Sequence, residues 1–264
     1  MTASTGLVGY VRDQTRPALT AAGGFVRMCV LTGRALFRPP FQWREFILQS
    51  WFLFRVSFLP TLAVSAPLTV LLIFLLNILL AEFGAADVSG AGAAIGAVTQ
   101  LGPLVTVLVV AGAGSTAICA DLGARTIREE IDAMKVIGVN PIQALVVPRI
   151  IAATFVALLL YSVVAVTGLT GSYIFVVFVQ HVTPGAFITG MTLVTGLPQV
   201  VISLIKATLF GLSAGLIACY KGLSVGGGPT GVGNAVNETV VFSFMALFFI
   251  NIVLTALGVK VTAK

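Results

Sequence analysis

The chain has 264 residues, of which 58% are hydrophobic and only 9% are charged. A soluble domain carries roughly 25% charged residues, and a soluble fold of this length could not hide so much apolar surface from water. The net charge of +6 does not indicate nucleic-acid binding, because no basic face interleaved with stacking aromatic rings remains once the apolar stretches are set aside. We therefore expect an all-α, polytopic integral membrane protein that binds no nucleic acid.

Residues 1–55 are predicted to form an N-terminal cytoplasmic or interfacial segment. On a helix, four arginines fall within about 40° of one another, namely Arg16, Arg27, Arg34 and Arg38. This pattern is typical of a basic amphipathic helix in the inner leaflet, although a soluble helix packed on a partner shares it. After Pro39 and Pro40, the aromatic-rich residues 41–54 are expected at interfacial depth, where aromatic rings anchor.

Five runs that lack charge, or contain a single charge, are each long enough to cross the hydrocarbon core, which needs about 20 apolar residues. They cover residues 56–81, 88–120, 150–180, 195–220 and 239–259. We therefore expect a transmembrane domain over residues 56–264 with five membrane-spanning helices.

Basic residues are distributed unequally between the two ends of these spans. Twelve lie on the side of the N-terminus, whereas only Lys260 and Lys264 lie on the other side. Because cytoplasmic segments carry an excess of Lys and Arg, we expect a cytoplasmic N-terminus and an external C-terminus in the cell (inner or plasma) membrane.

The connection between the second and third spans is densely charged, with six charges in eleven residues: Arg125, Arg128, Glu129, Glu130, Asp132 and Lys135. Ile127, Ile131 and Met134 recur at helical spacing and predict an apolar stripe on a short helix over about 124–137. Arg128 and Asp132 have the spacing of an i,i+4 pair, and Gly138 with Pro141 would end the helix. A solvated connector explains the charges but not the stripe, which favours docking of a cytoplasmic partner.

Residues 226–233 are rich in glycine and invite comparison with a phosphate-binding loop. They lack the Lys-Ser/Thr of a Walker A sequence, and no strand precedes them. We interpret them as a cytoplasmic hinge, so ATP would have to bind to another subunit.

The run EEIDAMKVIGVNPIQALVVPR at 129–149 strongly resembles the signature of the MlaE/YrbE family of ABC-transporter permeases. Residues 38–46, 58–60, 205–223 and 231–243 also match, in the family's order. The resemblance implies a non-catalytic membrane subunit of an ATP-driven, MCE-type lipid transporter, which binds no cofactor itself. A cytoplasmic ABC ATPase dimer would bind and hydrolyse ATP.

The same resemblance implies particular site residues and partners. The coupling helix, held in a groove of the ATPase, would use Ile127, Arg128, Glu129, Glu130, Ile131, Asp132, Met134, Gly138 and Pro141. A second YrbE/MlaE-type permease, expected to be non-identical, would complete a dimer beneath a hexamer of MCE-domain proteins. Asn251 stands where relatives often carry Asp, so no role of that acid is transferred to this chain.

Lys206 is the only full charge inside a predicted span. A charge at mid-membrane costs roughly 2.5–3.5 kcal/mol or more, so such residues usually line a cavity or find a partner. Snorkelling of the long side chain to the interface is the alternative. We favour a position in a central substrate cavity, where the ammonium could meet an anionic lipid headgroup.

Other functions fit the sequence less well. An ion-coupled secondary transporter normally needs intramembrane acids and inverted repeats, and neither is visible. A structural membrane anchor for an envelope assembly is a second alternative. His181 is the only histidine, and Cys29, Cys119 and Cys219 are far apart, so we expect neither a metal site nor an intramembrane protease.

Overall fold

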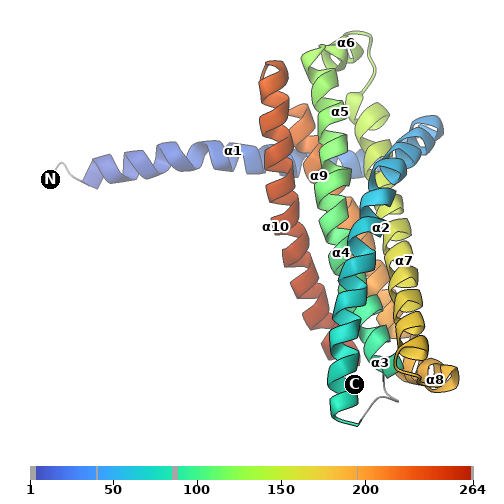
Figure 1. Ribbon diagram of the computed structural model, residues 1–264. Coiled ribbons are helices and arrows are strands. Elements are labelled where there is room, and N and C mark those ends of the chain that lie inside the picture. The colour runs from blue at the N-terminus through green and yellow to red at the C-terminus, as the bar shows by residue number, and fades with distance from the viewer. Residues whose placement is uncertain (1–3, 40, 85–88, 195, 263–264) are drawn as a thin grey trace.

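The computed structural model describes residues 4–39, 41–84, 89–194 and 196–262, and every regular element within those residues is a helix (Figure 1). The α-helices are α1 (Ser4–Leu36), α2 (Trp43–Glu82), α3 (Ser89–Ala94), α4 (Gly102–Val109), α5 (Ser115–Ile127), α6 (Glu130–Val136), α7 (Val147–Phe178), α8 (Pro184–Val194), α9 (Leu197–Leu223) and α10 (Gly228–Thr262). Short π-helical segments join some of them: η2 (Ile95–Leu101), η3 (Val110–Gly114) and η4 (Ile142–Val146).

Among the described residues, five helical stretches are long and apolar enough to cross a membrane. They are Trp43–Leu80, Ser89–Ile127, Ile142–Phe178, Pro198–Leu223 and Gly228–Gly258. The second stretch is built from α3, η2, α4, η3 and α5, which follow one another without a loop. The all-α polytopic fold with five spans is therefore confirmed.

The first three spans and the fifth are longer than the sequence predicted, and the fifth begins at Gly228 and includes Glu238. The first three share a common cause. The prediction ended each apolar run before the nearest charged residue, whereas the helices continue through Glu45, Asp121 and Arg149. These three charges are brought together, as described below.

The helix α2 also continues across position 55, where the N-terminal segment was expected to end, and includes Pro60 and Pro67. Neighbouring helices compensate such breaks in membrane helices.

The second span lies at the centre of the bundle, and α10 is the span least buried by its neighbours. The helix α2 packs along α7, and α9 packs against α5, α7 and α10. Glycines allow the closest of these contacts. A Cβ atom on Gly211 of α9 would lie 2.5 Å from the Thr154 Cα of α7. Without a hydrophobic driving force between helices in lipid, such close backbone approach is a main source of stability.

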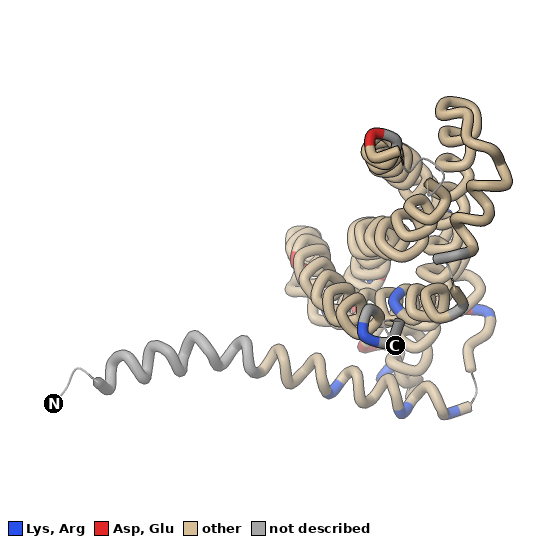
Figure 2. Tube along the Cα trace, turned by 90° about the horizontal axis from the view of Figure 1, so that it is seen from below, with Lys and Arg blue, Asp and Glu red and all other residues tan. Residues whose placement is uncertain are grey.

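The helix α1 crosses the long axis of the bundle near the end that carries α6 (Figure 1). It docks through Met28, Thr32 and Ala35, which are buried. The Tyr220 hydroxyl of α9 donates a hydrogen bond of 2.8 Å to the Ala21 carbonyl. Basic residues follow one another along the described part of α1 (Figure 2), and Arg27, Arg34 and Arg38 are exposed.

Candidate functional site

The charged connection predicted as one helix over about 124–137 is broken into two helices. The helix α5 ends at Ile127, and Glu129 adopts a left-handed backbone with φ of 59° before α6 begins. A non-glycine residue in this region is uncommon, and nothing in the local sequence signals it. Gly138, with φ of 81°, follows the end of α6 as expected.

The apolar stripe of this connection packs against the chain itself. Ile131 is only 7% exposed, and Met134 contacts the main hydrophobic core. The break at Glu129 interrupts the helical periodicity, so Ile131 turns inward, whereas Ile127 and Met134 are half-buried. Docking of a partner at this stripe stays a prediction. The apolar side chains that this connection exposes are those of Val136 and Ile137, with exposed fractions of 86% and 74%.

The charges of this connection also pair differently from the prediction. Arg128 Nε lies 2.8 Å from Glu130 Oε1, and Asp132 pairs with Lys135 at 2.7 Å. The expected Arg128–Asp132 pair does not form, because Glu129 breaks the helix between them. Glu129 is exposed and takes part in none of the ion pairs found among the described residues.

Beneath this connection, the bundle buries a complete guanidinium group. The Arg149 side chain has no exposed surface, and Nη2 lies 2.5 Å from Asp121 Oδ2 and 3.4 Å from Glu45 Oε1. Nη1 donates to the Leu145 carbonyl at 3.0 Å. Sequence analysis assigned Arg149 to the loop and missed this cluster. A possible signal was the opposite charges of Asp121 and Arg149 at the matching ends of consecutive spans.

The buried cluster is continuous with the charges of α6. Asp121 Oδ1 lies 3.4 Å from Arg125 Nε, and Arg125 Nη1 lies 3.7 Å from Glu130 Oε2. We call this set the ion-pair chain. Its members are Arg128, Glu130, Arg125, Asp121, Arg149 and Glu45.

Lys206 is buried between α9 and α10 and is 3% exposed. Its Nζ donates a hydrogen bond of 2.8 Å to Thr255 Oγ1, and the Thr255 hydroxyl in turn donates to the Asn251 carbonyl at 2.6 Å. The side chain thus faces α10 inside the bundle.

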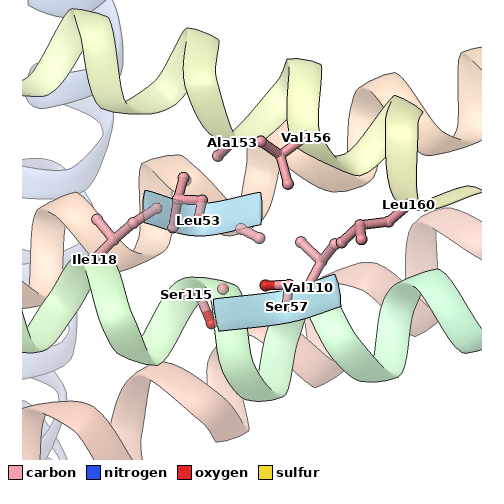
Figure 3. A pocket seen from close by; sticks show the side chains of 11 residues that line it. Leu53, Ser57, Val110, Ser115, Ile118, Ala153, Val156 and Leu160 are labelled. Carbon is pink, nitrogen blue, oxygen red and sulfur yellow. The ribbon is translucent and has the colours of Figure 1, made fainter. Parts of the chain in front are cut away.

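A small apolar cavity lies in the middle of the bundle (Figure 3), between α2, the second span, α7 and α9. It holds about 260 Å³ of empty space, open solvent included, and its lining does not include Lys206. Because that figure includes open solvent, the enclosed space is well below the roughly 300–1,000 Å³ of pockets for small molecules, and the cavity is too small for a two-chain lipid. It is lined by Leu53, Ser57, Val110, Gly114, Ser115, Ile118, Ala153, Val156, Leu160, Ala214 and Gly215.

These features define a class: a multi-pass helical membrane protein whose second and third spans are joined by a broken, charged helix at one end of the bundle. A family model described as "Permease MlaE" matches residues 46–257. Because the match covers most of the sequence, the chain belongs to the MlaE permease family.

Individual relatives agree with this assignment. A probable ABC transporter permease protein of Rickettsia typhi is 33% identical over 162 residues, which cover 61% of this chain and 62% of the relative. One of Synechocystis sp. is 30% identical over 173 residues, 66% of each chain. Protein TRIGALACTOSYLDIACYLGLYCEROL 1, chloroplastic, of Arabidopsis thaliana is 29% identical over 157 residues, 60% of this chain and 45% of that protein. The alignments thus span less than two thirds of the first relative's length.

Proposed function

We propose that this chain is the membrane-embedded subunit of an ATP-driven ABC transporter that moves lipids between the membrane and the cell envelope. The observation that carries the proposal is the α5–α6 connection. It presents the exposed side chains of Glu129, Val136 and Ile137 beyond the apolar spans. A short helix with an apolar tip and flanking charge is suited to docking in a groove of a partner. ATP binding and hydrolysis belong to that partner, an ABC ATPase dimer.

The name of one relative supports lipid as the substrate, and the packing of this chain bears on where the lipid would pass. One relative, from Arabidopsis, is named after trigalactosyldiacylglycerol. In this chain, the internal cavity is too small for a lipid, whereas α10 exposes the large apolar side chains of Val241, Phe242, Met245, Phe249 and Ile252. A substrate path therefore fits better at the boundary between this chain and a second, non-identical permease than inside one chain.

In the proposed orientation, the end with α1 and α6 faces the cytoplasm, as the distribution of basic residues indicates. The ATPase would dock at this end, and a hexamer of MCE-domain proteins would receive or deliver lipid at the other. Lys206 would reach an anionic headgroup when α9 and α10 separate, because in this structure it is buried between them and donates to Thr255.

Replacing the apolar tip by acids tests the proposal. In a Val136→Glu/Ile137→Glu variant, we expect the ATPase to dissociate, or lipid-stimulated ATP turnover to fall at least about tenfold, because each buried apolar side chain contributes about 1.5–3 kcal/mol. The measurement is copurification of the ATPase from membranes, followed by ATP turnover in lipid nanodiscs.

The control is Gly185→Glu, which adds one negative charge, half that of the double variant, at the opposite end, where no atom lies within 4 Å of a new Cβ. It should leave both readouts unchanged. Unchanged copurification and unchanged turnover in the Val136→Glu/Ile137→Glu variant would contradict the docking role. If the native chain purified with no ATPase at all, a secondary transporter or a structural anchor would become the better interpretation.

A further inference from the structure

The buried guanidinium of Arg149 joins three membrane helices at one point. It belongs to α7, while its two carboxylate partners, Asp121 and Glu45, belong to α5 and α2. Taking a charge out of water is strongly unfavourable unless it is paired with good geometry. Any relative movement of these three helices must therefore preserve or exchange the contacts of Arg149.

Charges of alternating sign continue from this point to α6. Asp121 contacts both Arg149 and Arg125, and Glu130 contacts both Arg125 and Arg128. Each of these carboxylates is shared between two cations. Moving one cation therefore changes the electrostatic energy of the carboxylate's pair with the other cation. Three consecutive ion pairs thus form a continuous path from α6 toward α7 and α2: Glu130–Arg125, Arg125–Asp121 and Asp121–Arg149.

The backbone departs from regular α-helix beside Arg128, at one end of the ion-pair chain, and beside Arg149. The left-handed Glu129 separates α5 from α6. The π-helical segment η4 lies directly before α7, and its Leu145 carbonyl accepts the Arg149 hydrogen bond. Left-handed non-glycine residues store strain that often marks switch regions, and π-helical segments are frequent at functional sites. The charged path therefore passes two places where the backbone departs from regular α-helix.

We propose that the ion-pair chain transmits movement of α6 to α2 and α7, with Arg149 as the positioning residue that holds the three spans in register. This inference rests on the proposed function, because it requires a partner that moves α6 when ATP is hydrolysed. It assigns Glu45, Asp121 and Arg149 a role in coupling that is distinct from docking.

The most informative variant is Arg125→Gln. It breaks the middle of the ion-pair chain, but leaves Arg149 paired with Asp121 and Glu45, so no buried charge loses its partners. The full transporter complex is reconstituted in vesicles containing a fluorescent phospholipid. Lipid transfer and ATP hydrolysis are then measured together. We expect the number of lipids moved per ATP to fall roughly 5- to 150-fold, the range of typical coupling energies, while ATPase assembly and ATP turnover are retained.

The matched control is Glu238→Gln, which removes the Lys221–Glu238 pair of 2.6 Å between α9 and α10. This pair shares no residue with the ion-pair chain and should be dispensable for coupling. An equal fall in lipids moved per ATP in Glu238→Gln would overturn the proposal, because any ion pair would then have the same effect. An unchanged ratio in Arg125→Gln would also overturn it.

A double-mutant cycle tests whether the middle and the α2 end of the ion-pair chain act as one unit. Glu45→Gln and Arg125→Gln alter residues of α2 and α5 that form no ion pair with each other and are joined through Asp121 and Arg149. If the path is continuous, the double variant loses little more than the stronger single variant. If the fold-losses of the two single variants multiply in the double variant, the two residues act independently, and the proposal is contradicted.

Two further results separate the inference from the function on which it rests. Loss of the ATPase from the Arg125→Gln complex would overturn the inference, because the residue would then act in docking or folding. Failure of the native complex to couple lipid transfer to ATP would instead refute the proposed function.

Discussion

Arg149 and Lys206 are both buried cations, but the bundle accommodates them differently. Arg149 has two carboxylates within 3.4 Å and a carbonyl at 3.0 Å, so its charge is balanced inside the chain. Lys206 has a hydroxyl, that of Thr255, and belongs to none of the ion pairs among the described residues. An ammonium group has three donors, so Lys206 retains the capacity to bind an anion, whereas Arg149 is suited to holding helices together.

Replacing Lys206 by Met removes the charge and keeps much of the side-chain volume. We expect transfer of an anionic lipid to fall about tenfold or more, because a hydrogen bond to a charged group contributes about 1.5–3 kcal/mol. Assembly with the ATPase should persist. The measurement compares transfer of anionic and zwitterionic fluorescent lipids in reconstituted vesicles.

The control for Lys206→Met is Thr255→Val, which removes the partner hydroxyl but keeps the ammonium, and should retain anionic lipid transfer. Equal transfer of both lipids by Lys206→Met and by the native chain would show that Lys206 does not contact the substrate.

At the scale of helices, the contact between α7 and α9 depends on the absence of side chains. A Cβ on Gly211 would lie 2.5 Å from Thr154 Cα and 2.6 Å from the Ala153 carbonyl oxygen. Both obstacles are backbone atoms, which cannot move without shifting a whole helix. On Gly215, one turn further along, a Cβ would lie 3.2 Å from the Ala153 Cβ. The two glycines therefore set the distance between these spans.

Gly211→Ala is expected to destabilise the protein by about 1–3 kcal/mol, the usual cost of overpacking a close contact. Gly233→Ala is the comparison, since Gly233 lies within α10 and no atom lies within 4 Å of a new Cβ. That change should be neutral or stabilise by about 0.5–1 kcal/mol. Thermal unfolding in detergent measures both. Equal midpoints for the two variants would mean that α7 and α9 can separate without cost.

At the scale of the whole molecule, the odd number of spans predicts that the two termini lie on opposite sides of the membrane. The end of the bundle that carries α6 also receives α1, through the Tyr220–Ala21 hydrogen bond and a bond from Gln143 Nε2 to the Arg38 carbonyl. The basic residues on α1 and the ion-pair chain thus lie toward the same end. The distribution of charge along the sequence predicts that this end is cytoplasmic.

Cysteine labelling with a membrane-impermeant maleimide tests this orientation. Lys264→Cys, a position outside the described residues, should react from the external side, and Gly226→Cys in the α9–α10 connection only after the membrane is opened. Both are made with Cys29→Ser, although burial raises the pKa of the Cys29 thiol and should already slow its reaction. Reaction of position 264 from the cytoplasmic side alone would refute the topology.

The sequence by itself determined the class of protein, the number of spans and the family. Lipid imposes a local requirement, about 20 consecutive apolar residues for each crossing, so each span can be read without knowing its neighbours. The end of α6 could also be predicted from the local sequence, because Gly138 takes the left-handed conformation that glycine adopts without a steric penalty. The family signature at 129–149 lies within the residues that the family model matches.

The tertiary structure alone decided where the first three spans end and which way the charged connection faces. Glu45, Asp121 and Arg149 look like loop charges in sequence, yet they lie within helices because residues far apart in the chain neutralise one another. The break at Glu129 turned Ile131 inward and exposed Val136 and Ile137. Ion pairing between helices, and a backbone conformation that tertiary contacts hold in place, are not encoded by a local pattern, so only the folded bundle could reveal them.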